Sequence, residues 1–153
     1  MPHRSDSRAQ RDAEPLIREK VARHIGKTLS PATVRLEGGA LVQVDGAADD
    51  ESVLVEIFAH QGSLKGGQRH KVAQDALKLI TLGRSRPDAQ LILAFADPDA
   101  AAYASKGTWL AEALAMWGVS VLVVELDEAV RAGIRDAQVR QEMVNPAAGE
   151  PPE

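Results

Sequence analysis

Apolar and polar positions along the chain follow two different periods, and the changes of period divide the sequence into helices and strands. Apolar residues that recur every three or four positions predict helices, whereas alternation or a short continuous apolar run predicts a strand. On this basis we expect helices at 14–29, 68–82, 105–117 and 128–143. We expect strands at 33–36, 40–45, 52–59, 90–95 and 119–126.

The order of these elements predicts an α/β fold. The first two strands are joined across Gly38-Gly39, which indicates a hairpin because glycine tolerates the positive φ angles of tight turns. A third strand completes a β-meander, and the two later strands enter through helical crossovers. We expect a mixed five-stranded sheet flanked by helices, in a single domain at 14–143. Residues 1–13 are expected to be a disordered tail and 144–153 a flexible one.

Composition limits the class of protein without deciding its activity. The chain has 153 residues, of which 44% are hydrophobic and 26% charged, and these shares are ordinary for a globular domain. It has no cysteine, which excludes disulfides and thiolate metal sites. No apolar run approaches the ~20 residues that a membrane span needs, and the N-terminus has no apolar signal core. We therefore expect a cytoplasmic protein without a membrane partner.

Charge is distributed unevenly along the chain. The net charge of −4 argues against a general nucleic-acid binder. However, the segment 65–86 has six Lys or Arg and one acid, whereas 45–56 has five acids and no base. An acidic pocket beside a basic surface suits a metal-dependent enzyme that acts on a phosphodiester.

Two carboxylates stand out from the apolar runs around them. Glu56 interrupts the strand V-L-V-E-I-F, where a charged side chain is costly to desolvate unless it meets a cation or a proton. Asp45 ends the preceding apolar run, L-V-Q-V. Because carboxylates and carbonyl oxygens suit Mg²⁺, we expect Asp45, Glu56 and the carbonyl of Ile57 to be metal ligands.

The succession of helix, β-meander, helix and strand, with Asp45 in V-D-G and Glu56 in V-E-I-F, resembles the PD-(D/E)XK nuclease superfamily over roughly 14–126. The resemblance implies a restriction-endonuclease-like core and a nuclease that depends on Mg²⁺ or Mn²⁺, with DNA favoured as substrate. It implies that Glu14 or Glu19 of the first helix adds an acid. A homodimer is also in keeping with it.

The sequence departs from the family pattern at the motif lysine. That lysine falls two residues after the second acid, and here the position is Phe58. The resemblance implies that a residue of the following helix takes its role, for which Lys71, Lys65 and Gln68 are candidates. His60 shares the strand parity of Glu56 and is a candidate base. The expected nucleic-acid contacts are Lys65, Arg69, Lys71 and Lys78.

Structural interpretations compete with these assignments. Asp45-Gly46 is also typical of a turn, and Glu56 could form a structural ion pair with Arg35 or Lys71. A catalytically inactive member of the same fold would bind nucleic acid or a protein partner. A scaffold or regulatory domain without a nucleic-acid role is a third alternative.

Side-chain spacing adds two further expectations. Lys71, Asp75 and Lys78 share one helical stripe opposite the predicted apolar face, which is typical of a solvated surface. Trp109 and Trp117 are expected in the core rather than as platforms for stacked bases.

Overall fold

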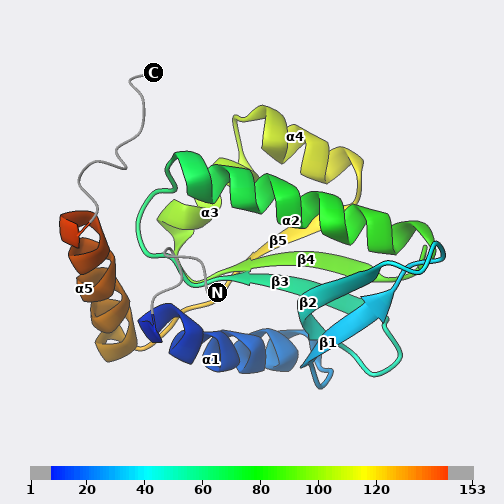
Figure 1. Ribbon diagram of the computed structural model, residues 1–153, viewed down its shortest axis with the longest axis horizontal. Helices are drawn as coiled ribbons and strands as arrows, with labels where there is room; N and C mark the ends of the chain where they lie inside the picture. The colour runs from blue at the N-terminus through cyan, green and yellow to red at the C-terminus, as the bar shows by residue number, and fades with distance from the viewer. Residues whose placement is uncertain (1–7, 145–153) are drawn as a thin grey trace.

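A computed structural model describes residues 8–144, in which five strands form one mixed sheet in the order β1-β2-β3-β4-β5 (Figure 1). The strands are β1 (Ser30–Arg35), β2 (Leu41–Ala47), β3 (Val53–Phe58), β4 (Gln90–Phe95) and β5 (Val119–Val123). The helices are α1 (Arg8–Ile25), α2 (Gly66–Arg84), α3 (Pro98–Ser105), α4 (Trp109–Met116) and α5 (Glu128–Val144). Within these residues no helix is both long and apolar enough to cross a membrane.

Strand directions confirm the predicted α/β fold class. Strands β1, β2 and β3 form an antiparallel meander, and β4 and β5 run parallel to β3 after helical crossovers. Gly39 in the β1–β2 hairpin has a φ of 95°, which glycine adopts without steric cost. The element order on which the resemblance to PD-(D/E)XK nucleases rests is thus present.

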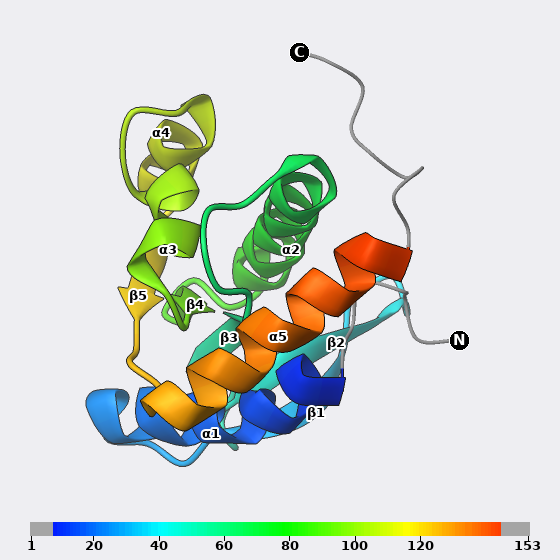
Figure 2. The same ribbon diagram turned by 90° about the vertical axis from the view of Figure 1, so that its left-hand side faces the viewer.

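Helices cover both faces of the sheet. In β3, Val53, Val55 and Ile57 pack with α1 and α5, whereas Leu54 and Phe58 pack with α2, α3 and α4. Figure 1 shows α2, α3 and α4 on one side of the sheet and α1 on the other, and Figure 2 shows α5 crossing beside α1. Every residue of β3 is buried, because the strand lies between two helical layers.

Three expectations about elements differ from the structure. Helix α1 already begins at Arg8, so 8–13 is not a disordered tail; Ala13 is buried in the core and Ala9 packs against it. Of the predicted C-terminal tail, Val144 is the last residue of α5. The remaining tail residues, 1–7 and 145–153, lie outside the described residues. The helix expected at 105–117 is shorter, because α4 covers only 109–116, and α3 at 98–105 is a further helix that the sequence did not predict. Asp97 caps α3 and Thr108 caps α4, so each helix has its own start.

The prediction that both tryptophans belong to the core is wrong. Trp109 is 66% exposed and Trp117 is 61% exposed. Helix α4 is short and buries Leu110 and Leu114 against the sheet. Trp109 at its start and Trp117 just after its end therefore face solvent.

Candidate functional site

A β-bulge positions Asp45. The pairing of β1 with β2 shifts at Pro31, where Asp45 and Gly46 together oppose a single residue. Strand β2 pairs with β3 at Ala47 and Gly46, and this pairing ends before Asp45. At that point the Asp45 Oδ2 atom accepts a hydrogen bond of 2.9 Å from the Ile57 backbone amide. Arg18 Nε donates to the Asp45 carbonyl at 2.8 Å and fixes the bulge from the α1 side. Asp45 is therefore more than a turn residue: its carboxylate bridges the gap between two parting strands.

Glu56 faces α2 and is 2% exposed. Burial is the main cause that raises its pKa to about 9, and a hydrogen bond and the negative charge of Asp45 raise it further. Lys78 Nζ lies 2.7 Å from Glu56 Oε1 and partly offsets these effects. Among the described side chains, Glu56 Oε1 and Asp75 Oδ2 are the buried oxygens for which no hydrogen bond is found, and each instead has a lysine ammonium within ion-pair distance.

The partner of Glu56 differs from the sequence-based alternatives. Arg35 donates to the Gly39 carbonyl at 3.4 Å, and Lys71 pairs with Asp75 rather than with Glu56. Lys78 takes this place. The sequence pattern places Lys78 among the expected nucleic-acid contacts, yet its position three residues after Asp75 is a signal that both side chains lie on one side of the helix.

The expectation that the Lys71–Asp75–Lys78 stripe is solvated holds for Lys71 but is wrong for Asp75, and Lys78 is only partly exposed. Asp75 is 5% exposed, with Lys71 Nζ 3.7 Å from Oδ2 and Lys78 Nζ 3.8 Å from Oδ1. Burial raises the pKa of Asp75 and the two lysines lower it. Helix α2 is rotated from the predicted orientation, because it packs through Asp75 and Leu79 while Leu77 is 65% exposed.

The remaining candidates on α2 separate into two groups. The Lys71 ammonium lies 5.7 Å from the centre of the Phe58 ring, and Gln68 lines the same hollow as Lys71. Lys65 Nζ instead lies 4.0 Å from Glu142 on α5. Gln68 also accepts a hydrogen bond from the Lys65 amide at the start of the helix.

Arg69 has contacts of its own away from Glu56. Its guanidinium stacks 4.9 Å from the Tyr103 ring centre, and its Nε donates to the Leu64 carbonyl at 3.2 Å. The predicted nucleic-acid contacts therefore do not form one surface: Arg69 turns toward α3 and Lys78 toward Glu56.

Glu14 connects two hollows beside the sheet. One is lined by Glu14, Arg18 and Asp45, among others. The other includes Glu14, Ile57, His60, Gln68 and Lys71. Of the two acids expected from the first helix, Glu14 is the one that lies here.

Glu19 instead pairs with Arg23 at 2.6 Å on the exposed side of α1. His60 is partly buried, and burial is the main cause that lowers its pKa, so its imidazole is neutral near neutral pH.

The acids of the candidate site offer few ligands to a divalent cation. Residues 8–144 contain no group of three or more His, Cys, Asp or Glu placed to hold a metal. Mg²⁺ needs only one or two protein carboxylates because it keeps several waters. Asp45 raises the pKa of Glu56, so two adjacent acids present oxygen atoms and like charge, and the Lys78 ammonium lies 2.7 Å from Glu56 Oε1. The two acids are of the ligand type that Mg²⁺ or Mn²⁺ takes, and an ion bound there would share Glu56 with Lys78.

Comparisons with known proteins add a similarity of shape. No family model matches the chain, and no curated protein matches it. The solved apo form of EndoMS resembles it with a TM-score of 0.44 and 17% sequence identity. The match covers 81% of this chain and 49% of that one, so this chain spans about half the length of EndoMS. Similarity at this level carries no argument about activity.

Proposed function

We propose that this protein is a metal-dependent nuclease that hydrolyses phosphodiester bonds in nucleic acid, with DNA as the favoured substrate. The observation that carries the proposal is the meeting of Asp45 and Glu56 where β2 and β3 part. Lys71 supports it, because its ammonium lies over the ring of Phe58, the position of the lysine in the PD-(D/E)XK motif. Glu14 adds a further acid beside the same hollow.

Asp45, Glu56 and the Ile57 carbonyl would hold Mg²⁺ or Mn²⁺. Such an ion, when bound, supplies Lewis-acid stabilisation of the phosphate and lowers the pKa of a coordinated water. Glu56 would bind the ion as a carboxylate, its proton released to solvent, and Lys78 would stabilise that carboxylate. Lys71 orients the scissile phosphate and stabilises developing negative charge. His60, neutral at its lowered pKa, would accept the proton of the attacking water at the rim of the hollow.

A catalytically inactive binding module is the second candidate. Phe58 at the motif-lysine position favours it, as does the 2% exposure of Glu56 under its contact with Lys78. In this alternative the Lys78 ammonium permanently takes the place of the metal ion beside Glu56. The fold then contributes only a binding surface for nucleic acid or a protein.

Metal binding and cleavage distinguish these candidates. Calorimetry with Mn²⁺ should detect binding to the wild type that Asp45→Ala and Glu56→Ala abolish. The same variants should lose at least ~100-fold in cleavage of single-stranded, duplex and nicked DNA and of RNA with Mg²⁺ or Mn²⁺, because each removes a ligand. Asp88→Ala is the matched control, since this exposed carboxylate lies in the turn before β4.

Two outcomes count against the nuclease. One is cleavage that persists equally in Asp45→Ala and Asp88→Ala. The other is a wild type that binds DNA but cleaves none of these substrates, which would favour the inactive module.

A further inference from the structure

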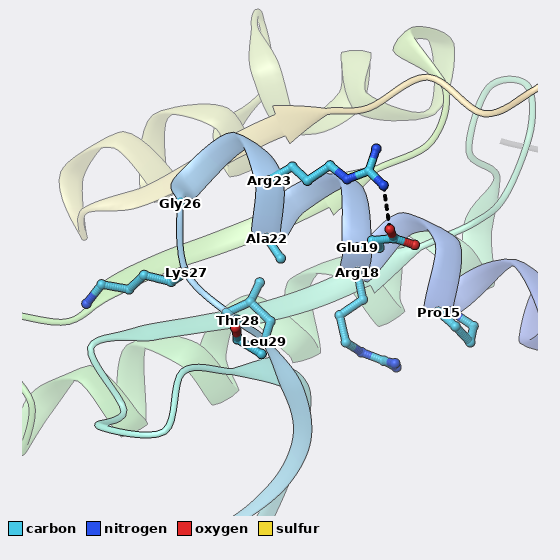
Figure 3. Close-up of a pocket in the computed structure, with 9 residues that line it drawn as sticks. All are labelled: Pro15, Arg18, Glu19, Ala22, Arg23, Gly26, Lys27, Thr28 and Leu29. Atoms are coloured by element: carbon cyan, nitrogen blue, oxygen red, sulfur yellow. Dashed lines mark hydrogen bonds and ion pairs between the residues drawn. The ribbon is translucent and has the colours of Figure 1, made fainter.

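A basic hollow lies at the end of α1 away from Glu14. It has a volume of about 480 Å³ and lies between the C-terminal half of α1 and the segment that enters β1 (Figure 3). Among the described residues three cations line it, Arg18, Arg23 and Lys27, against one carboxylate, Glu19. Figure 3 shows Arg18 and Lys27 extending on opposite sides of Thr28 and Leu29.

Shared lining residues place this hollow beside the hollow of Asp45. Arg18 lines both the basic hollow and the hollow of Asp45, and Glu14 lines the hollow of Asp45 and that of Lys71. We call these three neighbouring hollows, each lined in part by α1, the α1 groove. From Glu14 to Ile25 the helix rises roughly 17 Å at 1.5 Å per residue. That length equals about five nucleotide steps of 3.4 Å.

Charge changes sign along the α1 groove. Glu14 and Asp45 lie at the acidic part, whereas Arg18, Arg23 and Lys27 lie at the basic part. Arg18 stands at the junction, held by its hydrogen bond to the Asp45 carbonyl. A substrate with regularly spaced phosphates would thus meet cations just beyond the acids.

The ion pairs present in the basic hollow leave it able to bind an anion. Arg23 pairs with Glu19, and Lys27 pairs with Asp50 at 3.7 Å and donates to Ser52 Oγ at 2.5 Å. Both ion pairs are largely solvent-exposed, and such pairs contribute little net energy, so a phosphate can replace the carboxylates. The carbonyl end of α1 carries about half a negative charge, which three cations outweigh.

We propose that the basic hollow binds backbone phosphates of the nucleic acid whose cleavage the Asp45–Glu56 site performs. The inference rests on the proposed function for the identity of the ligand. It adds a contact surface on the α1 side of the sheet, opposite the α2 side to which the sequence had assigned the phosphate contacts.

The test measures binding without cleavage. A fluorescently labelled DNA duplex is titrated with the full chain in EDTA, and anisotropy gives Kd at several salt concentrations. Arg23→Ala/Lys27→Ala should raise Kd about tenfold and reduce the salt slope by roughly two, because two phosphate contacts are lost. Arg84→Ala/Lys106→Ala removes two exposed charges elsewhere and should stay within about threefold of the wild type.

Equal losses in both double variants would overturn the proposal, since only net charge would then matter; so would no loss in Arg23→Ala/Lys27→Ala. The swap Arg23→Lys/Lys27→Arg keeps both charges and should bind like the wild type, and melting of Arg23→Ala/Lys27→Ala at the wild-type temperature excludes misfolding as the cause of the loss. Wild-type protein that binds no duplex even at low salt also overturns it.

Cleavage by the same proteins separates the two proposals. A wild type that cleaves while Arg23→Ala/Lys27→Ala binds normally would refute the basic hollow alone. Binding that depends on the basic hollow, in a protein that cleaves nothing, would refute the nuclease and leave the phosphate site standing.

Discussion

Glu56 concentrates the chemistry of the candidate site in one side chain. It lies in the central strand, where both faces of the sheet are covered, so its carboxylate has little access to water. Asp45 adds a second acid beside it, and Lys78 compensates only in part, so the pKa of Glu56 is raised to about 9. A group in this state binds a proton in the folded protein and releases it on unfolding or on binding a cation.

The pH dependence of stability should report this proton. The ordinary pKa of Glu56 is 4.5 and the folded value is about 9, so the folded state binds more protons than the unfolded state between these pH values. The stability of the wild type should fall as pH rises from 5 to 9. Glu56→Gln cannot ionise, so its melting temperature relative to the wild type should increase by several degrees over this range.

Thermal unfolding of both proteins at pH 5, 7 and 9 checks this expectation. Glu37→Gln is the control, because Glu37 is exposed in the β1–β2 turn and its difference from the wild type should not change with pH. A constant difference for Glu56→Gln would show that Glu56 is ionised throughout the range.

At the scale of an element, α2 brings two lysines to two different places. Lys78 is 29% exposed and contacts both buried acids, Glu56 and Asp75. Lys71 is 53% exposed and lies over Phe58, at the rim of the hollow. One lysine therefore contacts the buried acids, whereas the other is the one that the proposed function places against the substrate.

Substitution should separate these roles. Lys78→Met leaves two buried acids with less compensation and should cost about 2–3 kcal/mol, below the full cost of breaking a buried pair because Lys78 retains some exposure. Lys71→Met should cost under about 1 kcal/mol but reduce cleavage at least ~100-fold. Urea unfolding and single-turnover cleavage measure the two effects.

Glu56 holds a proton below about pH 9, so adding Glu56→Gln to Lys78→Met should change stability little at pH 7 and recover part of the lost stability above pH 9, where the uncompensated acid would otherwise be ionised. Similar stability losses in the two lysine variants would contradict this division of roles.

At the scale of the whole molecule, α5 is attached by polar contacts as much as by apolar ones. Gln61 is 3% exposed and receives hydrogen bonds from both Arg131 and Gln138 of α5. Gln138 Oε1 in turn accepts from the Gln61 amide at 2.9 Å. The same loop continues into the start of α2, so α5 and the candidate site share one support.

Gln138→Ala should therefore loosen α5 selectively. It removes two hydrogen bonds to the buried backbone of Gln61, at a cost of about 1–3 kcal/mol. Hydrogen exchange should become faster in α5 and in the loop at 59–64, while α2 beyond its first turn keeps its protection. Arg140→Ala, an exposed change on the same helix, should leave exchange unchanged. Uniform acceleration across the sheet would mean that α5 is not a separate unit.

Much of this architecture follows from local sequence patterns. The meander, the crossovers and the buried central strand are read from the periods of apolar residues, because those periods reflect the geometry of single helices and strands. The same patterns single out Asp45 and Glu56, since an acid in a fully apolar strand needs a partner wherever that strand lies.

The partners of these acids are decided by the tertiary structure. The rotation of α2 depends on the whole layer beneath it, which buries Asp75 and brings Lys78 to Glu56. The bulge that aims Asp45 arises from the register between β1 and β2, and neither strand specifies that register alone. The sequence by itself therefore determined most of the elements and singled out Asp45 and Glu56 as the acids that need a partner. Only the packed sheet decided which cations they meet, because contacts between elements are set by relative rotation and register.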